Sequence, residues 1–331
     1  MLQFSKDYKE ILRQYVLSQT EQNLYIGQNF SRQLIEKNIA PEDVIGIHKA
    51  ALEEIFPDMP EQLLHSFDLL IEVMIRYGLA LKEHESLVKK QEELKMEMDL
   101  AANVQETMLK TKVPQLSGFD IGLVSIPAKK MNGDYIYFVS NDDQHADVAV
   151  ADVIGKGIPA ALCMSMIKFA MDSLQHSSTN PDYMLDMMNG IVERNMDDSM
   201  FISMFYGRID IKKSRFTYAS AGHEPALLYR AAEDRFEYLE AKGILLGVDP
   251  SAVFEKHDVT LNKDDFIVIM TDGVTESRTK EGFITQQTLL SLIRDAKDLP
   301  AQEMTDHIFQ LLARSQDYEL RDDFTMVVLK K

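Results

Sequence analysis

The spacing of apolar residues changes near Pro114, and this change divides the chain of 331 residues into two parts that must fold differently. Before it, apolar side chains recur at helical spacing, as in Tyr8, Ile11, Leu12 and Tyr15. After it, short apolar runs bounded by turn residues alternate with helical stretches, which indicates strands as well as helices. The length allows two domains of ordinary size.

The spacing of apolar residues predicts a helical domain over residues 1–81. Phe30 and Leu34 continue the helical spacing in a second segment, and Pro41 and Pro60 mark the starts of a third and a fourth, because proline is favoured in the first turn of a helix. Four such helices pack as a bundle. The segment carries no cluster of polar residues of the kind that binds a small molecule, so we expect it to bind a partner protein and to support dimerisation.

Residues 82–111 predict a linker helix, because the segment is charged and contains neither proline nor glycine. Leu87, Leu94, Ala101 and Met108 lie seven residues apart, which is the repeat of a helix that packs along a second helix. Two interpretations remain open. The seam packs against the same helix of a second copy in a homodimer, or the helix lies on the domain that follows.

Residues 112–331 predict an α+β domain, because the expected strands bunch together and the expected helices come in pairs. Strands are expected at residues 119–126, 135–140, 147–153, 201–211, 215–220, 226–229, 266–270 and 324–329. Helices are expected at residues 159–174, 181–195, 286–296 and 301–315.

Composition excludes several classes of function. The net charge of −18 is the opposite of the basic footprint that nucleic-acid binding needs. No apolar segment is long enough to span a bilayer, and residues 1–7 lack the apolar core of a signal peptide. Cys163 is the only cysteine, so no intrachain disulfide forms. We therefore expect a cytoplasmic protein with no nucleic-acid or membrane partner.

Four aspartates define the candidate site, and each lies at the start or end of an apolar run. They are Asp134 in Asn-Gly-Asp-Tyr, Asp152 in Asp-Val-Ile-Gly-Lys-Gly, Asp272 in Thr-Asp-Gly and Asp322 in Arg-Asp-Asp-x-Thr. A single Asp-Gly is more often a turn than a ligand. Four carboxylates gathered without basic partners repel one another, however, and such a group is favourable only around hard cations that take oxygen ligands.

In this order, the four motifs resemble those of the PPM (type 2C) metal-dependent Ser/Thr protein phosphatases, in particular the bacterial SpoIIE branch. The resemblance includes Ala-Gly-His-x-Pro at residues 221–225 and Leu-Gly at residues 246–247, and its catalytic part covers residues 112–331. It implies an αββα sandwich whose two antiparallel sheets meet at an acid-lined cleft, preceded by the helical bundle and the linker.

The resemblance also implies roles for individual residues. Asp134 and Asp152 would hold two divalent cations between them, manganese or magnesium, and the backbone carbonyl of Val153 would add a ligand. Asp272 and Asp322 would complete the shell of one ion.

The neighbouring acid, Asp323, ranks below Asp322 because the first acid of the family's Asp-Asp/Asn-x-Thr/Ser motif is the ligand. Two positions depart from the family pattern, since Asn132 and Ala151 stand where the family more often has glycine. Neither departure removes a ligand, but each affects how easily the backbone bends around the cations.

Two cations suit the hydrolysis of a phosphate ester, which is extremely slow without a catalyst. They lower the pKa of a shared water and neutralise the phosphoryl oxygens. No histidine cluster or Ser-His-Asp pattern suggests a covalent route, so water should attack the phosphate directly. His223 is either a general acid or a structural hydrogen-bonding residue in its loop. Gly155 and Gly157 either cradle an anion at a helix N-terminus or permit the turn before the helix at residues 159–174.

The resemblance further implies a substrate and a regulator. The substrate would be a phosphorylated anti-sigma-factor antagonist of the STAS type in a stress-response partner-switching pathway, and a kinase-like switch protein would activate the enzyme at residues 1–81. Packing of the linker on the helix after Asp152, through Ala101, Val104 and Met166, would let that partner set cation affinity. A catalytically silent scaffold of the same fold is the main alternative, although it should have lost an acid. A nucleotidyl cyclase would not require the last two motifs.

Overall fold

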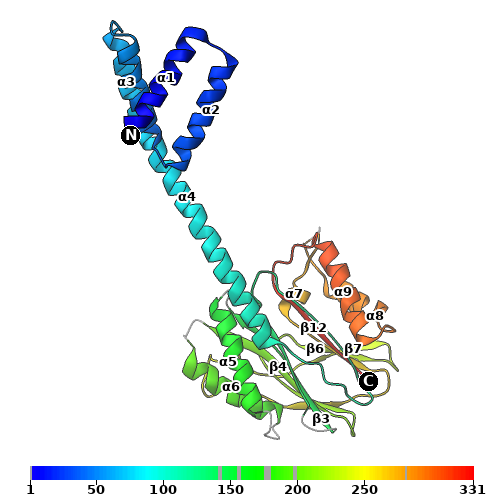
Figure 1. Ribbon diagram of the computed structural model, residues 1–331. Helices are drawn as coiled ribbons and strands as arrows, with labels where there is room; N and C mark the ends of the chain where they lie inside the picture. Colours follow the sequence, from blue (N-terminus) through cyan, green and yellow to red (C-terminus); the bar gives the residue numbers. More distant parts are fainter. Residues whose placement is uncertain (1, 141–143, 155–157, 175–179, 197–199, 280–281) are drawn as a thin grey trace. The chain divides into compact units, whose positions relative to one another are not determined.

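The computed structural model describes residues 2–140, 144–154, 158–174, 180–196, 200–279 and 282–331 (Figure 1). The chain divides into two compact units, Met1–Met96 and Glu97–Lys331. No helix in the described segments is both long and apolar enough to cross a membrane. Residues 155–157, which include Gly155 and Gly157, lie outside the described part of the chain.

The first unit consists of helices, as the spacing of its apolar residues predicted. They are α1 (Leu2–Ser18), α2 (Glu21–Glu36), α3 (Pro41–Ile55) and the first part of α4 (Glu61–Leu109). The side chain of Thr20 caps α2 by accepting a hydrogen bond from the backbone N–H of Asn23, and Pro41 opens α3. Phe30 and Leu34 are buried on the inner face of α2.

Helix α4 runs without a break from Glu61 to Leu109. The expected fourth helix and the expected linker helix at residues 82–111 are therefore parts of one element, with no structural boundary at residue 81. The sequence explains the continuity, because residues 79–109 contain neither glycine nor proline and are rich in glutamate, lysine, leucine and alanine, which favour helix.

Two antiparallel five-stranded sheets form the framework of the second unit (Figure 1). Sheet 1 has the order β1 (Asp120–Ile126), β12 (Phe324–Lys330), β9 (Phe266–Met270), β6 (Ala226–Arg230) and β7 (Arg235–Leu239). Sheet 2 has the order β2 (Asp134–Val139), β3 (His145–Ile154), β4 (Phe201–Asp210), β5 (Arg215–Ala221) and β8 (His257–Thr260). A separate hairpin pairs β10 (Arg278–Thr279) with β11 (Gly282–Phe283).

Helices cover the outer face of each sheet, which gives the predicted αββα layers (Figure 1). The covering helices are α5 (Ile158–Leu174) and α6 (Pro181–Asn195) on sheet 2, and α8 (Gln286–Asp295) and α9 (Ala301–Ser315) on sheet 1. Three apolar layers result, around Met164 beneath α5, around Phe205 between the sheets and around Ile308 beneath α9. All three side chains are fully buried, and this close packing makes the sheet ends rigid supports.

Four strands (β7, β8, β10 and β11) and one short helix were not predicted from the sequence. β7 and β8 are edge strands that pair with one neighbour each, and most of their residues are at least partly exposed. They lack the apolar run that reveals an inner strand such as β9, whose five residues are all buried. The short helix α7 (Asp272–Thr275) directly follows β9.

Candidate active site

Sheet 2 places Asp134 and Asp152 side by side. β2 begins at Asp134, β3 ends two residues after Asp152, and the antiparallel register pairs the two aspartates directly. Directly opposed residues in such a pair project their side chains on the same face, with Cβ atoms about 5 Å apart. The pairing of β2 with β3 therefore brings together two carboxylates from opposite ends of this strand pair in the sequence.

Sheet 1 brings Asp272 and Asp322 to the same end of two neighbouring strands. β9 ends just before Asp272 and β12 begins just after Asp322 and Asp323, and these strands are antiparallel neighbours. The backbone N–H of Thr271 donates to the carbonyl of Thr325 at 3.1 Å, which extends the pairing beyond the strands.

The close approach of Gly273 to the backbone of Asp323 explains why the Thr-Asp-Gly turn ends in glycine. A Cβ at this position would lie 2.0 Å from the carbonyl oxygen of Asp323 and 2.9 Å from its carbonyl carbon. Only a residue without a side chain lets the turn approach the backbone of Asp323 so closely.

Hydrogen bonds join the two sheets at this end. Thr271 Oγ1 donates to Asp134 Oδ2 at 2.8 Å, and Thr325 also hydrogen-bonds the Asp134 carboxylate. Asp323 accepts from the backbone N–H groups of Gly133 at 2.5 Å and Ala128 at 2.8 Å. Its carboxylate therefore fixes the loop before Asp134, whereas Asp322 is exposed. This difference supports Asp322 as the better candidate ligand of the two.

The space beside Gly133 is lined by oxygens. A Cβ on Gly133 would lie 3.6 Å from Asp152 Oδ1, 3.7 Å from the carbonyl oxygen of Val153 and 3.3 Å from Asp323 Oδ2. The Asp152 carboxylate and the Val153 carbonyl thus face the same small volume. A side chain at Gly133 would intrude among these oxygens.

The acids disturb one another electrostatically. Burial raises the pKa of Asp152 most, the charges of Asp272, Asp322 and Asp323 add to the effect in that order, and together they bring this pKa to about 7. Burial, followed by the charge of Asp152, raises the pKa of Asp134 well above its usual range, although the threonine hydrogen bonds oppose the shift. Bringing these carboxylates together therefore costs free energy.

The chemistry of this donor set fits hard divalent cations. The candidate ligands are carboxylates and one backbone carbonyl, which suit magnesium or manganese better than zinc. Within the described residues, no three Asp, Glu, His or Cys side chains already converge closely enough to hold an ion. The acids form a loose group that shares one edge rather than a preformed cage.

His223 is placed for a structural role. The side chain is 8% exposed, its Nδ1 lies 2.7 Å from Ser203 Oγ, and its backbone N–H donates to Ser220 Oγ at 3.2 Å. Burial lowers the pKa of His223 to about 4, so the imidazole is neutral at pH 7. A buried, neutral imidazole is poorly suited to protonate a leaving group.

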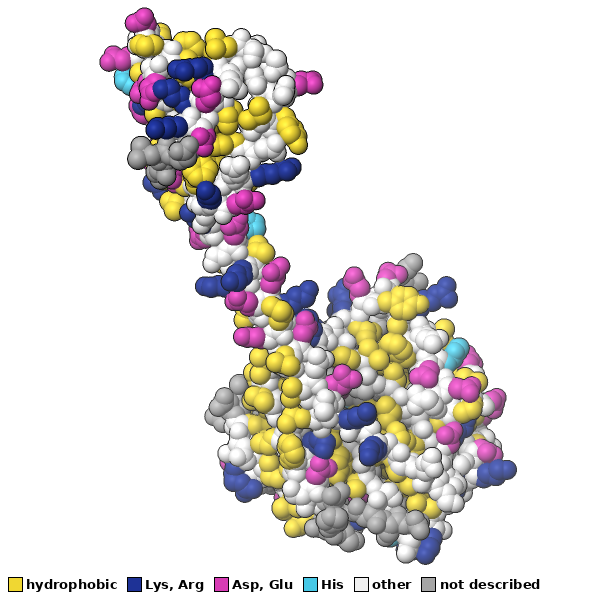
Figure 2. All heavy atoms as spheres, in the orientation of Figure 1, with side chains coloured by type: hydrophobic (Ala, Val, Ile, Leu, Met, Phe, Trp, Pro, Cys, Tyr) yellow, Lys and Arg dark blue, Asp and Glu magenta, His cyan; other side chains and the backbone are white. Residues whose placement is uncertain are grey.

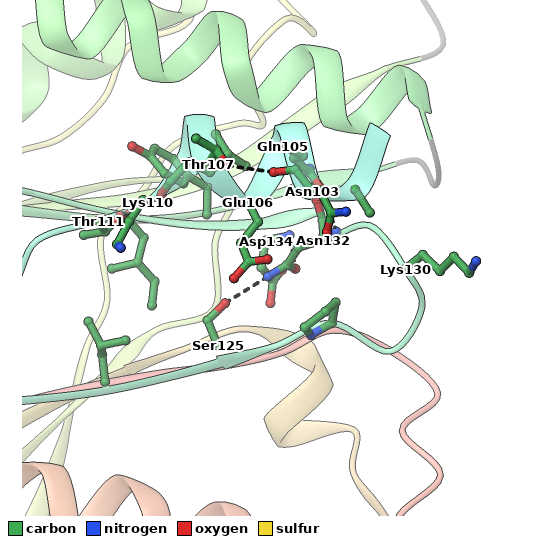
Figure 3. Close-up of a pocket in the computed structure, with 16 residues that line it drawn as sticks. Asn103, Gln105, Glu106, Thr107, Lys110, Thr111, Ser125, Lys130, Asn132 and Asp134 are labelled. Atoms are coloured by element: carbon green, nitrogen blue, oxygen red, sulfur yellow. Dashed lines mark hydrogen bonds between the residues drawn. The ribbon is translucent and has the colours of Figure 1, made fainter. Parts of the chain in front are cut away.

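Sequence reasoning missed the hydrogen-bonding roles of several polar residues around the acids. Asn132 Oδ1 accepts from the backbone N–H of Asp134 at 2.9 Å, and its Nδ2 donates to Ser125 Oγ at 2.9 Å (Figure 3). Both line a cavity of about 800 Å³ between the end of α4 and strands β1 and β2. The threonines of Thr-Asp-Gly and Arg-Asp-Asp-x-Thr were visible as motif members, but nothing local in the sequence revealed their contact with Asp134.

Replacing Gly273 by alanine should separate the turn from the Asp322–Asp323 backbone. We expect a loss of about 2 kcal/mol in the free energy of unfolding and at least a tenfold loss of cation-dependent phosphatase activity. Gly190→Ala is the matched control, because its Cβ would meet only the end of the Arg194 side chain at 3.5 Å or more. Wild-type behaviour of Gly273→Ala in urea unfolding and in activity assays would contradict the close approach.

Replacing Asp152 by asparagine should stabilise the cation-free protein, and more so at high pH. With its pKa raised to about 7, Asp152 is protonated in the folded chain but charged in the unfolded chain between about pH 4 and pH 7. The resulting cost grows over that range and is complete above it. The gain from the substitution should be about 2 kcal/mol larger at pH 8 than at pH 5.5.

This difference is measured by urea unfolding of chelator-treated protein at both pH values. Asp258→Asn makes the same chemical change at an exposed position on β8 and serves as the control. An equal gain at both pH values would show that the Asp152 carboxyl is not strained by its neighbours.

Comparison with known proteins finds a matching protein family for each of the two units. A family model described as stage II sporulation protein E (SpoIIE) matches residues 142–331, and one described as the N-terminal domain of phosphoserine phosphatase RsbU matches residues 6–80. Phosphoserine phosphatase RsbU from Bacillus subtilis (strain 168) is 49% identical over 324 residues, which cover 98% of this chain and 96% of that protein. The resemblance drawn from the motifs is confirmed.

Solved structures share the fold of the second unit. The SiaA PP2C domain of Pseudomonas aeruginosa superposes with a TM-score of 0.61 at 20% identity, over 73% of this chain and 98% of that one. RsbX, solved in complex with magnesium, gives a TM-score of 0.51 at 19% identity over 66% of this chain and 98% of that one. With the sandwich fold and a relative that matches almost end to end, the chain belongs to the RsbU-like serine phosphatases of the SpoIIE family, whose catalytic domain has the PP2C fold.

Proposed function

We propose that this chain hydrolyses phosphoserine or phosphothreonine in a protein, with two manganese or magnesium ions as cofactors. The observation that carries the proposal is the meeting of Asp134 and Asp152 from sheet 2 with Asp272 and Asp322 from sheet 1 at one edge of the sandwich. These four side chains and the Val153 carbonyl are the groups that would hold the cations. When bound, two such cations supply a deprotonated water at neutral pH and neutralise developing phosphoryl charge.

The chain's own groups orient this machinery. Thr271 and Thr325 fix the Asp134 carboxylate, and Asp323 fixes the loop before it through two backbone N–H groups. Oriented ligands matter because small displacements of a reacting centre have large effects on rate. The silent-scaffold alternative is disfavoured, since all four acids are present.

The substrate that we propose is a serine-phosphorylated anti-sigma-factor antagonist of the STAS type, in a stress-response partner-switching pathway. Similarity to phosphoserine phosphatase RsbU over 98% of the chain supports this assignment. The N-terminal helices would bind the activating kinase-like switch protein, which is supported by the match of residues 6–80 to the RsbU N-terminal domain.

A homodimer through α4 is part of the proposal. Leu87, Leu94, Val104 and Met108 are all more than 40% exposed, and Figure 2 shows apolar side chains among the charged ones along this helix. Exposed apolar residues at such spacing are typical of a helix that packs along a second copy.

Replacing Asp152 by asparagine should abolish manganese-stimulated hydrolysis of p-nitrophenyl phosphate while the protein remains folded. The loss of a shared cation ligand is expected to raise the barrier by several kcal/mol, and each 1.36 kcal/mol is tenfold in rate. Asp258→Asn should retain normal activity. Retention of more than about a tenth of the wild-type rate in Asp152→Asn would refute the two-cation assignment.

Substitutions at Ala101, Val104 or Met166 should include some that raise basal activity and lower the manganese concentration required. Ala101 and Met166 are half-buried and Val104 is exposed, and next to Met166 the Ser165 Oγ lies 4.0 Å from Met108 Sδ. On this proposal, the packing of α4 on α5 sets cation affinity. Variants that change only thermal stability would make the linker a passive tether.

A further inference from the structure

The last turns of α4 contact the backbone of the loop that carries Asp134. Gln105 Nε2 donates to the carbonyl oxygen of Asn132 at 2.7 Å, and Gln105 Oε1 accepts from the backbone N–H of Asn132 at 3.1 Å. Figure 3 shows Gln105 beside Asn132 and Asp134. One side chain thus satisfies both backbone groups of a single residue, as a neighbouring strand would.

This contact is buried, which makes the identity of the side chain important. Gln105 is 5% exposed, although it lies on a helix whose neighbouring residues are largely exposed. Glutamine offers a donor and an acceptor together. A hydrocarbon in its place would leave the N–H and C=O of Asn132 without their partner, and unpaired buried backbone groups are unfavourable.

The contact is linked to Asp134 through two short steps. The side chain of Asn132 accepts from the backbone N–H of Asp134 and donates to Ser125. Between them, Gly133 donates to Asp323. The turn from Asn132 to Asp134 therefore has three anchors, on α4, on β1 and on the residues before β12, and only the anchor on α4 belongs to the helix that arrives from the N-terminal unit.

Two further contacts join the same segments. Lys130 forms an ion pair with Asp99, and Thr111 Oγ1 donates to the carbonyl oxygen of Ile136. Lys130 and Asp99 are each more than 40% exposed, so their pair contributes little. The buried Gln105 contact is the one that couples the position of α4 to the turn.

We propose that Gln105 is a positioning residue, through which the end of α4 holds the Asn132–Asp134 turn in the conformation that binds cations. The inference rests on the proposed function, because it takes Asp134 as a cation ligand. It gives α4 a direct connection to Asp134, which is separate from the packing of α4 on α5. Release of this contact would weaken cation binding without removing any ligand.

The test compares Gln105→Leu with a matched control elsewhere in the same unit. Gln302 on α9 makes the same pair of hydrogen bonds to one strand residue, accepting from Leu123 N at 3.1 Å and donating to Leu123 O at 2.9 Å. Gln302→Leu therefore removes the same two hydrogen bonds at an exposed position beside sheet 1. Manganese affinity is measured on the full-length chain by calorimetry, and turnover of p-nitrophenyl phosphate is measured across a manganese titration.

We expect Gln105→Leu to bind manganese about tenfold more weakly and to recover most of its kcat at saturating manganese. Gln302→Leu should remain within twofold of wild type in both measurements. Equal affinities for the two variants, or a loss of kcat in Gln105→Leu that excess manganese does not restore, would overturn the inference.

A second variant covers the case in which Gln105→Leu does not fold. Gln105→Glu keeps the acceptor for Asn132 N–H but replaces the donor, and it should also bind manganese more weakly than wild type. Wild-type affinity in Gln105→Glu would overturn the inference. Failure of the wild-type protein itself to bind manganese or to turn over substrate would instead refute the proposed function.

Discussion

Repulsion among carboxylates at one edge of the sandwich is the constraint that the catalytic unit must accommodate. Burial, followed by the charges of neighbouring aspartates, raises the pKa values of Asp134 and Asp152. No salt bridge with a lysine or arginine offsets the repulsion at these two residues in the described part of the chain. The fold instead supplies hydroxyl groups from Thr271 and Thr325.

The two sheets make that arrangement possible because each one holds its own pair of acids in place. Sheet 2 fixes Asp134 against Asp152 by register, and sheet 1 fixes the turn at Asp272 against the start of β12 by the close approach of Gly273. Apolar layers on both sides of each sheet hold the strand ends in place. Asp323, which bonds the loop before Asp134, then locks the two edges together.

Helix α4 ends beside the loop that carries Asp134, so its last turns contact the candidate site directly. Gln105, in its last turns, hydrogen-bonds the Asn132 backbone, and Thr111, two residues after the end of the helix, hydrogen-bonds β2. The helix is continuous from Glu61 to Leu109. Gln105 is buried where it contacts the Asp134 loop, whereas the apolar residues Leu87 and Leu94 of the same helix are exposed.

The sequence by itself determined the elements with a strong pattern and the acids with a recognisable context. Helical spacing predicted the N-terminal helices, apolar runs predicted inner strands such as β9, and the motifs around the four aspartates indicated the family. Local patterns suffice there because a buried strand or helix must repeat its apolar residues at the period of its backbone.

Only the tertiary structure decided which polar groups serve the site. Edge strands β7 and β8 carry no apolar run, and the burial of His223 and the pairing of Asp323 with Gly133 depend on segments distant in sequence. Gln105 looks like a solvent-facing residue of a charged helix until β2 and its preceding loop pack against it. A hydrogen bond between residues that are distant in sequence produces no repeating pattern in the sequence, so only the tertiary structure shows it.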